Sequence, residues 1–380
     1  MPEENQSTIV IDWYERHIPH FAEQELIRLY GTMYSSVAWL RVTEAPPGIH
    51  TYVARRGEEP VTILLCRTEG ACLKVVTESI ELSEEETQRF VEFVFSRFRQ
   101  VSVVALNAIK LDTRLVGRPR QQFCSAEDII VRLPGSEQDY VSMLGSATRK
   151  NVKRHINRLK RDFPSFEFKC LPASEAGEDV MREIIRFNHV RMYAKEMVSS
   201  IDERQAKLIV GMAQECGHVI TMRIDGRLCG GSIVYRFGTH FISRVSAHDS
   251  AYDDYRLGMT CCFMTVCEAI QLGGEHFHFM WGQYDYKTAL LGVQYDQYRT
   301  VIYRSPLAVV RHANLALQTV RQAVRLKGKR WLLKKIKEDT RSARLLQLAI
   351  AQCKKVRRVL HCRRLRARVE AHPVSPLAES

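Results

Sequence analysis

The stretch from Tyr252 to Gly292 constrains the fold more than any other part of the chain. A polar turn leads into Gly258, and apolar residues then recur at helical spacing as far as Ile270. Gly273 ends this predicted helix. The residues that follow predict a short buried strand with three aromatic side chains, Phe277, Phe279 and Trp281. A polar loop comes next, so polar residues flank the buried elements on both sides, in positions where two reactants can be held.

The residues upstream of this stretch predict a module that mixes helices and strands. Its strongest signal is a hairpin around the turn Asp225-Gly226-Arg227. Its strands are expected at residues 166–171, 219–224, 228–237 and 240–247, and its helices at residues 178–192 and 202–213. Together with the Tyr252–Gly292 stretch, these elements predict an α/β (α+β) module at residues 136–305.

The first 135 residues predict a second module of the same kind. Ser83 and Glu86 form a capping-box pattern at the start of an amphipathic helix. Strands are expected at residues 8–11, 51–55, 61–66, 72–77, 101–106 and 129–133. This half shows no cluster of catalytic side chains, so the chemistry is expected in the module at residues 136–305.

Positive charge is concentrated at the C-terminal end of the chain. The formal net charge is +13, and the residues from Arg304 onward hold 20 Lys and Arg against 4 Asp and Glu. The body is close to neutral, so its charge does not mark it as a nucleic-acid binder. Residues 306–370 predict a basic helical tail, and residues 371–380 a disordered C-terminus. A basic amphipathic helix favours an anionic membrane surface or nucleic acid, and a solvated hairpin packed on the body is the alternative.

The cysteines and the N-terminus bear on the compartment. The 11 cysteines include no CxxC pair, which favours buried thiols in a reducing cytosol and gives no support for a metal site. The N-terminus is polar and acidic, unlike a signal peptide, and no run of about 18 apolar residues occurs. We therefore expect a cytoplasmic protein, with the tail as a means of peripheral attachment to the inner face of the membrane.

Residues 136–163 predict a basic helix interrupted at Gly145-Ser146. A solvated basic face and an anion site are both consistent with its charges. Arg149 and Lys150 would lie in the first turn after Ser146, a good N-cap residue. Cations there oppose the helix dipole, so they make better sense with a phosphate between them and the free N–H groups.

Three segments carry a resemblance to a known family. The hairpin "DGRLCGGSIVYRF" resembles the central strands of the GNAT acyltransferase superfamily. The segments "GSATRKNVKRHINRL" and "GQYDYKTALLG" are similar to its CelD-like, Fem-related branch. Fem-type transferases carry two GNAT-like modules in tandem, so the resemblance implies this arrangement for residues 1–135 and 136–305.

Acyl transfer, the activity implied by the resemblance, needs an anion cradle for the donor and a route for the amine proton. The cradle is predicted at Arg256, Gly258 and Met259, where a glycine lets a phosphate approach the backbone. The base candidates are Asp253, Asp254 and His248. No metal is expected, and His276 and His278 are interpreted as a polar strand face.

The polar loop after Gly282 supplies the remaining candidates. Tyr286 is predicted to protonate the leaving thiolate or to orient the acceptor, since a pKa of about 10 suits an acid. Lys287 is predicted to be solvated, charged and in contact with a phosphate. The resemblance implies that Lys287 and Arg149 face one acceptor from opposite sides, with Lys150 as a further substrate contact.

The predicted reaction is direct attack of an amine on an acyl thioester, with acetyl-CoA or another acyl-CoA as co-substrate. The expected acceptor is a sugar, a cell-envelope or polysaccharide precursor, or another phosphorylated amine. Three departures from the family pattern keep other functions open. Gln283 replaces an acidic residue, His278 replaces a frequent Asp of the strand, and the phosphate loop is reduced to residues 256–260. The alternatives are a Fem-type transferase with an aminoacyl-tRNA donor and a non-catalytic binding or assembly factor.

Overall fold

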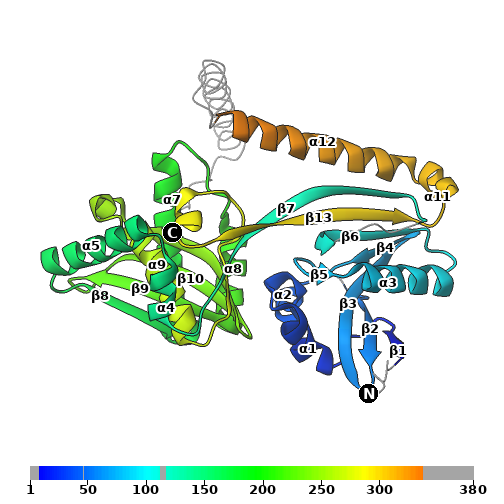
Figure 1. The fold of residues 1–380 in the computed structure, drawn as a ribbon, viewed down its shortest axis with the longest axis horizontal. Coiled ribbons are helices and arrows are strands. Elements are labelled where there is room, and N and C mark those ends of the chain that lie inside the picture. Colours follow the sequence, from blue (N-terminus) through cyan, green and yellow to red (C-terminus); the bar gives the residue numbers. More distant parts are fainter. Residues whose placement is uncertain (1–7, 46, 112–116, 337–380) are drawn as a thin grey trace, which may run out of the picture. The chain divides into compact units, whose positions relative to one another are not determined.

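The strands of the two predicted modules form one continuous mixed β-sheet. The computed structural model describes residues 8–45, 47–111 and 117–336 (Figure 1). The strand order is β1-β2-β3-β4-β6-β13-β7-β12-β11-β10-β9-β8, with β5 paired to β6. Residues 1–313 form one compact unit, and a second unit begins at Asn314. The α/β fold class is therefore confirmed.

The N-terminal half builds its sheet from hairpins and covers it with one long helix. Its strands are β1 (Ile9–Tyr14), β2 (His50–Arg56), β3 (Glu59–Glu69), β4 (Cys72–Val75), β5 (Glu81–Leu82), β6 (Val103–Leu111) and β7 (Arg120–Arg132). Its helical elements are α1 (Phe21–Tyr30), η1 (Met33–Ser35), α2 (Val37–Val42) and α3 (Glu84–Arg97). The predicted capping box is present: the Ser83 hydroxyl accepts from the Glu86 N–H at 3.1 Å, and the Ser83 N–H donates to the Glu86 carboxylate at 3.0 Å.

The C-terminal half follows the predicted order of elements. Its helical elements are α4 (Glu137–Met143), α5 (Ser146–Asp162), α6 (Ala173–Ala176), α7 (Glu178–Ala194), α8 (Glu203–Cys216), η2 (Ser250–Tyr255), α9 (Leu257–Gln271) and α10 (Asp285–Ala289). Its strands are β8 (Glu167–Pro172), β9 (Gly217–Ile224), β10 (Arg227–Phe237), β11 (His240–His248), β12 (His276–His278) and β13 (Val293–Tyr303). The predicted hairpin is the pair β9–β10.

Two long strands join the halves, and the sequence analysis did not predict their length. β13 pairs with β7 along one edge and with β6 along the other, as Figure 1 shows. The boundary predicted at residue 135 therefore does not separate two compact units. The strand predicted at residues 129–133 is only the end of β7, and β13 was not predicted. Both strands carry many polar residues, which weakens the alternation on which strand prediction rests.

Helix α9 is buried on nearly all sides, as its apolar pattern predicts. It packs on β10 and β11, and its apolar side chains form one core with Phe277 and Phe279. The predicted aromatic strand is shorter than expected, because β12 ends at His278. Trp281 is 54% exposed, so its assignment to a buried strand is wrong. The described cysteines are all free thiols, and Cys261, Cys262 and Cys267 are buried as expected.

The tail begins with α11 (Pro306–Arg311) and continues as α12 (Ala313–Ile336). One face of α12 carries four exposed apolar side chains, Leu317, Val320, Val324 and Trp331. The rest of the predicted basic tail, residues 337–370, and the disorder predicted at residues 371–380 lie outside the described residues. Among the helices that the structure describes, none has both the length and the apolar character needed to cross a bilayer.

Candidate functional site

A pocket opens where two neighbouring strands of the C-terminal sheet part. β11 and β12 pair in parallel from His240/His276 to Ile242/His278, and there β12 ends. β11 runs on to His248, and in the described chain no strand pairs with this edge beyond Ile242. Backbone groups and side chains of the second half of β11 are thus available to a ligand.

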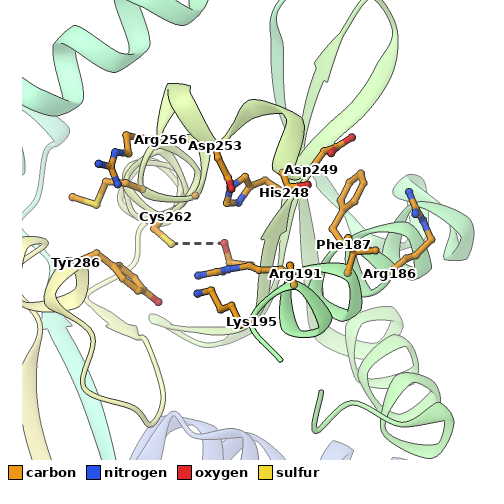
Figure 2. A pocket seen from close by; sticks show the side chains of 16 residues that line it. Arg186, Phe187, Arg191, Lys195, His248, Asp249, Asp253, Arg256, Cys262 and Tyr286 are labelled. Atoms are coloured by element: carbon orange, nitrogen blue, oxygen red, sulfur yellow. Dashed lines mark hydrogen bonds and ion pairs between the residues drawn. The ribbon is translucent and has the colours of Figure 1, made fainter. Parts of the chain in front are cut away.

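The pocket has a volume of about 530 Å³ and is lined by three groups of residues and by Tyr286 of α10. Helix α7 and the residue after it supply one wall, the end of β11 with η2 supplies the second, and the start of α9 supplies the third (Figure 2). The pocket brings together five of the predicted site residues: Asp253, Arg256, Gly258, Met259 and Tyr286. It does not include Arg149, Lys150 or Lys287.

The N-terminus of α9 has the features of an anion cradle. Arg256 precedes the helix in a left-handed conformation with φ of 52°, and no side chain caps the helix. The first N–H groups of a helix have no carbonyl partner within it, and the helix dipole favours negative charge there. A Cβ on Gly258 would lie 2.9 Å from Cε1 of His248. Gly258 therefore lets the imidazole pack directly against the cradle.

His248 and Asp253 form a hydrogen-bonded dyad at the pocket wall. The distance between His248 Nε2 and Asp253 Oδ1 is 2.9 Å, and the two side chains lie next to each other in Figure 2. A carboxylate only accepts, so Nε2 carries the proton and Nδ1 keeps its lone pair. This Nδ1 is buried and has no hydrogen-bond partner in the described chain. Burial lowers the pKa of His248 despite the opposing effect of Asp253, so the imidazole is neutral at pH 7 and suited to take up a proton.

Tyr286, in α10, lines the same pocket as the dyad. Its hydroxyl is protonated at pH 7. Burial raises the pKa of Tyr286 well above its usual range, although Arg191 opposes this shift. The neighbouring thiol of Cys262 is 3.7 Å from the Ser246 hydroxyl, the contact dashed in Figure 2. Burial raises the pKa of Cys262 to about 12, so this cysteine is not a thiolate at pH 7. The pocket thus offers a phenolic acid and no activated nucleophile of its own.

The α7 wall adds two cations that the sequence analysis missed. Arg191 and Lys195 are four residues apart, so they lie on one face of the helix end. Figure 2 shows both side chains pointing toward Tyr286. The only signal in the sequence was this basic spacing at the end of a predicted helix. This spacing is also typical of a solvated charged helix face, so the sequence did not predict a site there.

The prediction that Lys287 is solvated is wrong. Lys287 is 3% exposed, and its ammonium donates to the carbonyl oxygens of Phe279, Met280 and Trp281 at 2.9, 3.1 and 2.8 Å. An ammonium has three N–H donors, so none is left for a substrate. Lys287 therefore clamps the segment between β12 and the pocket loop, in which Met280 has a left-handed φ of 58°.

The predicted anion site at the start of α5 also differs from the structure. Gly145, not Ser146, is the N-cap residue, and no side-chain cap is present. Arg149 and Lys150 are exposed, and Arg149 contacts the Ser142 carbonyl at 3.5 Å. Since Lys287 is buried elsewhere, Arg149 and Lys287 do not face one acceptor. The exposure of Arg149 and Lys150 fits a solvated basic face, and the uncapped start of α5 fits the predicted anion site as well.

The strand histidines belong to a buried polar chain beside Lys287. His278 Nδ1 lies 2.7 Å from Asp128, and His278 Nε2 lies 3.0 Å from His240 Nδ1. His240 in turn stacks on His276 with ring centroids 4.5 Å apart. His276 and His278 thus share a polar face as predicted, and His240 contacts both of them. Within the described ranges, no three His, Cys, Asp or Glu side chains are placed to hold a metal ion.

Comparison with known proteins agrees with this geometry. Residues 146–288 match the family model described as "Acetyltransferase (GNAT) domain". The crystal structure of FemX is similar with a TM-score of 0.57 at 7% sequence identity, and the match covers 77% of this chain and 98% of FemX. The chain has a GNAT-superfamily, Fem-related fold. The matched GNAT segment contains the start of α9, the dyad and Tyr286.

Two further structures show similarity to the GNAT fold of this chain at lower scores. One is the C-terminal domain (DUF2156) of a putative lysylphosphatidylglycerol synthetase from Agrobacterium fabrum, with a TM-score of 0.47, 12% identity, and coverage of 79% of this chain and 95% of that one. The other is a tandem GNAT protein from the clavulanic acid biosynthesis pathway, with a TM-score of 0.35, 12% identity, and coverage of 78% and 99%. No curated protein sequence matches the chain significantly.

Proposed function

We propose that this protein is an N-acyltransferase that moves an acyl group from acyl-CoA to an amine. One observation carries the proposal: an uncapped helix N-terminus, a neutral histidine–carboxylate dyad and a protonated tyrosine line the same pocket. These groups match the needs of acyl transfer, which are an anion cradle, a proton acceptor and a leaving-group acid. The GNAT fold supports a transferase.

Each step of the reaction has a residue in the pocket. The diphosphate of the donor is held at Gly258 and Met259, with Arg256 beside them. The acceptor amine attacks the thioester carbonyl, and a C–N bond forms as the C–S bond breaks. The dyad of His248 and Asp253 takes the amine proton, and the Tyr286 hydroxyl protonates the departing thiolate. The transfer is direct, because the thiol of Cys262 is protonated.

The acceptor class rests on the cationic side chains predicted as anion contacts, which favour an acceptor with a phosphate group. We propose an amine on a sugar or on a cell-envelope or polysaccharide precursor, modified in the cytoplasm. A Fem-type aminoacyl-tRNA donor is the second candidate function. Two observations favour it. The structural match to FemX covers 98% of the FemX chain, and the phosphate loop at residues 256–260 is reduced.

Thermal unfolding with acetyl-CoA tests the donor. We expect acetyl-CoA to raise the melting temperature of the wild type, since a ligand that binds only the native state stabilises it. Gly258→Ala should lose this shift, because its Cβ would lie 2.9 Å from His248. Gly328→Ala, also in a helix but with no atom within 4 Å of its Cβ, is the matched control. No shift in the wild type, with a shift from aminoacyl-tRNA, would replace acyl-CoA by the second candidate.

We further propose that α12 binds an anionic membrane surface. Leu317, Val320, Val324 and Trp331 form one exposed apolar stripe, and exposed cations such as Arg321 and Lys327 lie beside it. The variant Val324→Glu/Trp331→Glu should lose co-sedimentation with vesicles that contain phosphatidylglycerol. Gln318→Glu, an exposed change off the stripe, should retain most of it. Equal sedimentation of both variants would contradict this role.

A further inference from the structure

The α7 wall of the pocket carries two cations that form no ion pair in the described chain. Arg191 is half-buried and Lys195 is exposed at the pocket mouth. Within the described residues, neither side chain forms an ion pair with a carboxylate; the ion pairs nearby involve Arg182, Arg186 and His248. The third cation of this wall, Arg186, is occupied by Glu183, with contacts of 2.6 and 2.5 Å. The uncompensated pair on this wall is therefore Arg191 and Lys195.

The two cations are close enough to affect each other. Arg191 is the largest cause of the lowered pKa of Lys195, and Asp253 opposes it only weakly. Like charges at helix spacing i and i+4 destabilise a helix. An anion between them removes that cost and gains charge-assisted hydrogen bonds, of which a guanidinium can offer two in parallel.

The same pocket contains a polar atom that lacks a partner. Nδ1 of His248 is buried without a hydrogen bond in the described chain, and its side chain is 10% exposed. Buried polar atoms in native proteins nearly always have a partner. Nδ1 lies on the Gly258 side of the ring, 3.1 Å from the position of a Cβ on that residue, so a ligand N–H would have to reach it along the start of α9. Arg191 is near enough to His248 to lower its pKa. Arg191 and His248 also line the same pocket, so one small molecule can reach both.

We propose that Arg191 and Lys195 bind a phosphate group of the acceptor and so place its amine beside His248. The proposal rests on the proposed acyl transfer only in assigning this ligand to the acceptor. The donor cradle is a different element, the start of α9 with Arg256. The acceptor is thus a phosphorylated amine of a size that a pocket of about 530 Å³ accommodates together with the donor's acyl end. Fixing the phosphate at one end orients the nucleophile at the other.

Isothermal titration without any donor tests the subsite with three probes: glucosamine 6-phosphate, glucosamine and inorganic phosphate. The two sugars differ only in the phosphate, and inorganic phosphate reports on the anion subsite even if the sugar ring does not fit. We expect the wild type to bind glucosamine 6-phosphate at least tenfold more tightly than glucosamine. Arg191→Gln/Lys195→Gln should remove that advantage, since each charge-assisted contact contributes about one to two powers of ten. Arg149→Gln/Lys150→Gln, the exposed pair on α5, is the matched control and should bind as the wild type does.

The outcomes separate the subsite from the reaction. Loss of phosphate binding in the α7 variant without any acyl transfer by the wild type supports the subsite and overturns the proposed function. Acyl transfer to glucosamine 6-phosphate with kcat and KM unchanged in the α7 variant supports the function and overturns the subsite. Equal affinity of the wild type for the two sugars, together with no binding of inorganic phosphate, also overturns it. A β-alanine titration distinguishes a carboxylate ligand: tighter binding than glucosamine 6-phosphate would contradict the assignment to phosphate.

Discussion

Replacing Lys287 with methionine tests whether this buried ammonium holds the pocket loop. Its three hydrogen bonds reach the carbonyl oxygens of Phe279, Met280 and Trp281 at 2.8 to 3.1 Å. A hydrogen bond from a charged donor contributes about 1.5–3 kcal/mol. Part of this gain is offset by desolvation, since burial lowers the pKa of Lys287 to about 8. Methionine leaves three carbonyls without their donor, so we expect the free energy of unfolding to fall by about 3–5 kcal/mol.

Urea unfolding followed by tryptophan fluorescence measures this change, and Trp281 lies within the clamped segment. Lys195→Met is the control, because Lys195 is exposed and should change stability by less than about 0.5 kcal/mol. The clamped segment leads to Tyr286, so the rate of acyl transfer should also fall in Lys287→Met. An unchanged rate would mean that the clamp is dispensable for the reaction. A loss of less than about 1 kcal/mol in Lys287→Met would refute the clamp.

Three further predictions concern the side chains of Tyr286, Asp253 and His240. Tyr286→Phe should lower kcat by about 10²-fold with acetyl-CoA, in the range for loss of a general acid, and an unchanged kcat would exclude that role. Asp253→Asn should lower kcat/KM and weaken its pH dependence between pH 5 and 8, since an amide no longer holds His248 in its tautomer; an identical profile would remove Asp253 from the dyad. Burial, with His278 and His276 facing it and Asp128 behind His278, lowers the pKa of His240 to about 3. The unfolded state therefore binds more protons below pH 6.5, and stability is lost as the pH falls, by at most about 2 kcal/mol from His240 at pH 5. His240→Gln should show a flatter pH dependence of unfolding, and equal slopes would contradict the assignment.

The sequence predicted the part of the site that is local in the chain. Asp253, Arg256, Gly258 and Met259 lie within one turn and the start of one helix, so their proximity follows from the helix boundary at Gly258. The apolar pattern after it fixed α9 as a buried helix, and the structure confirms this. Tyr286 joins them because the chain returns through β12 to the same end of the sheet.

The rest of the site depends on packing that no local pattern records. Arg191 and Lys195 come from α7, and only the packing of α7 on β11 brings them to the pocket. Lys287 follows Tyr284 and Asp285 in a polar loop, so its burial was not predictable from its neighbours. Arg149 and Lys150 remain a prediction. Both are exposed at the uncapped start of α5, which fits a solvated basic face and an anion site equally well, and they lie outside the pocket.

The length of β7 and β13 was missed for a related reason. Residues such as Gln294 and Asp296 interrupt the apolar alternation of β13, although its last residues are buried between β6 and β7. A strand that is exposed at one end and buried at the other has no single period. The two modules were therefore predicted correctly in fold class, while the strands that fuse them into one sheet were not.

Release of free CoA from acetyl-CoA tests the central claim most directly. A thiol reagent reports the breaking of the C–S bond, with glucosamine and glucosamine 6-phosphate as amine acceptors. We predict amine-dependent CoA release by the wild type and a loss of at least about 10²-fold in His248→Gln, with acetyl-CoA binding retained by calorimetry. Amine-dependent release at the wild-type rate in His248→Gln would contradict the proposed role of the dyad, and no binding of acetyl-CoA by the wild type would contradict the donor.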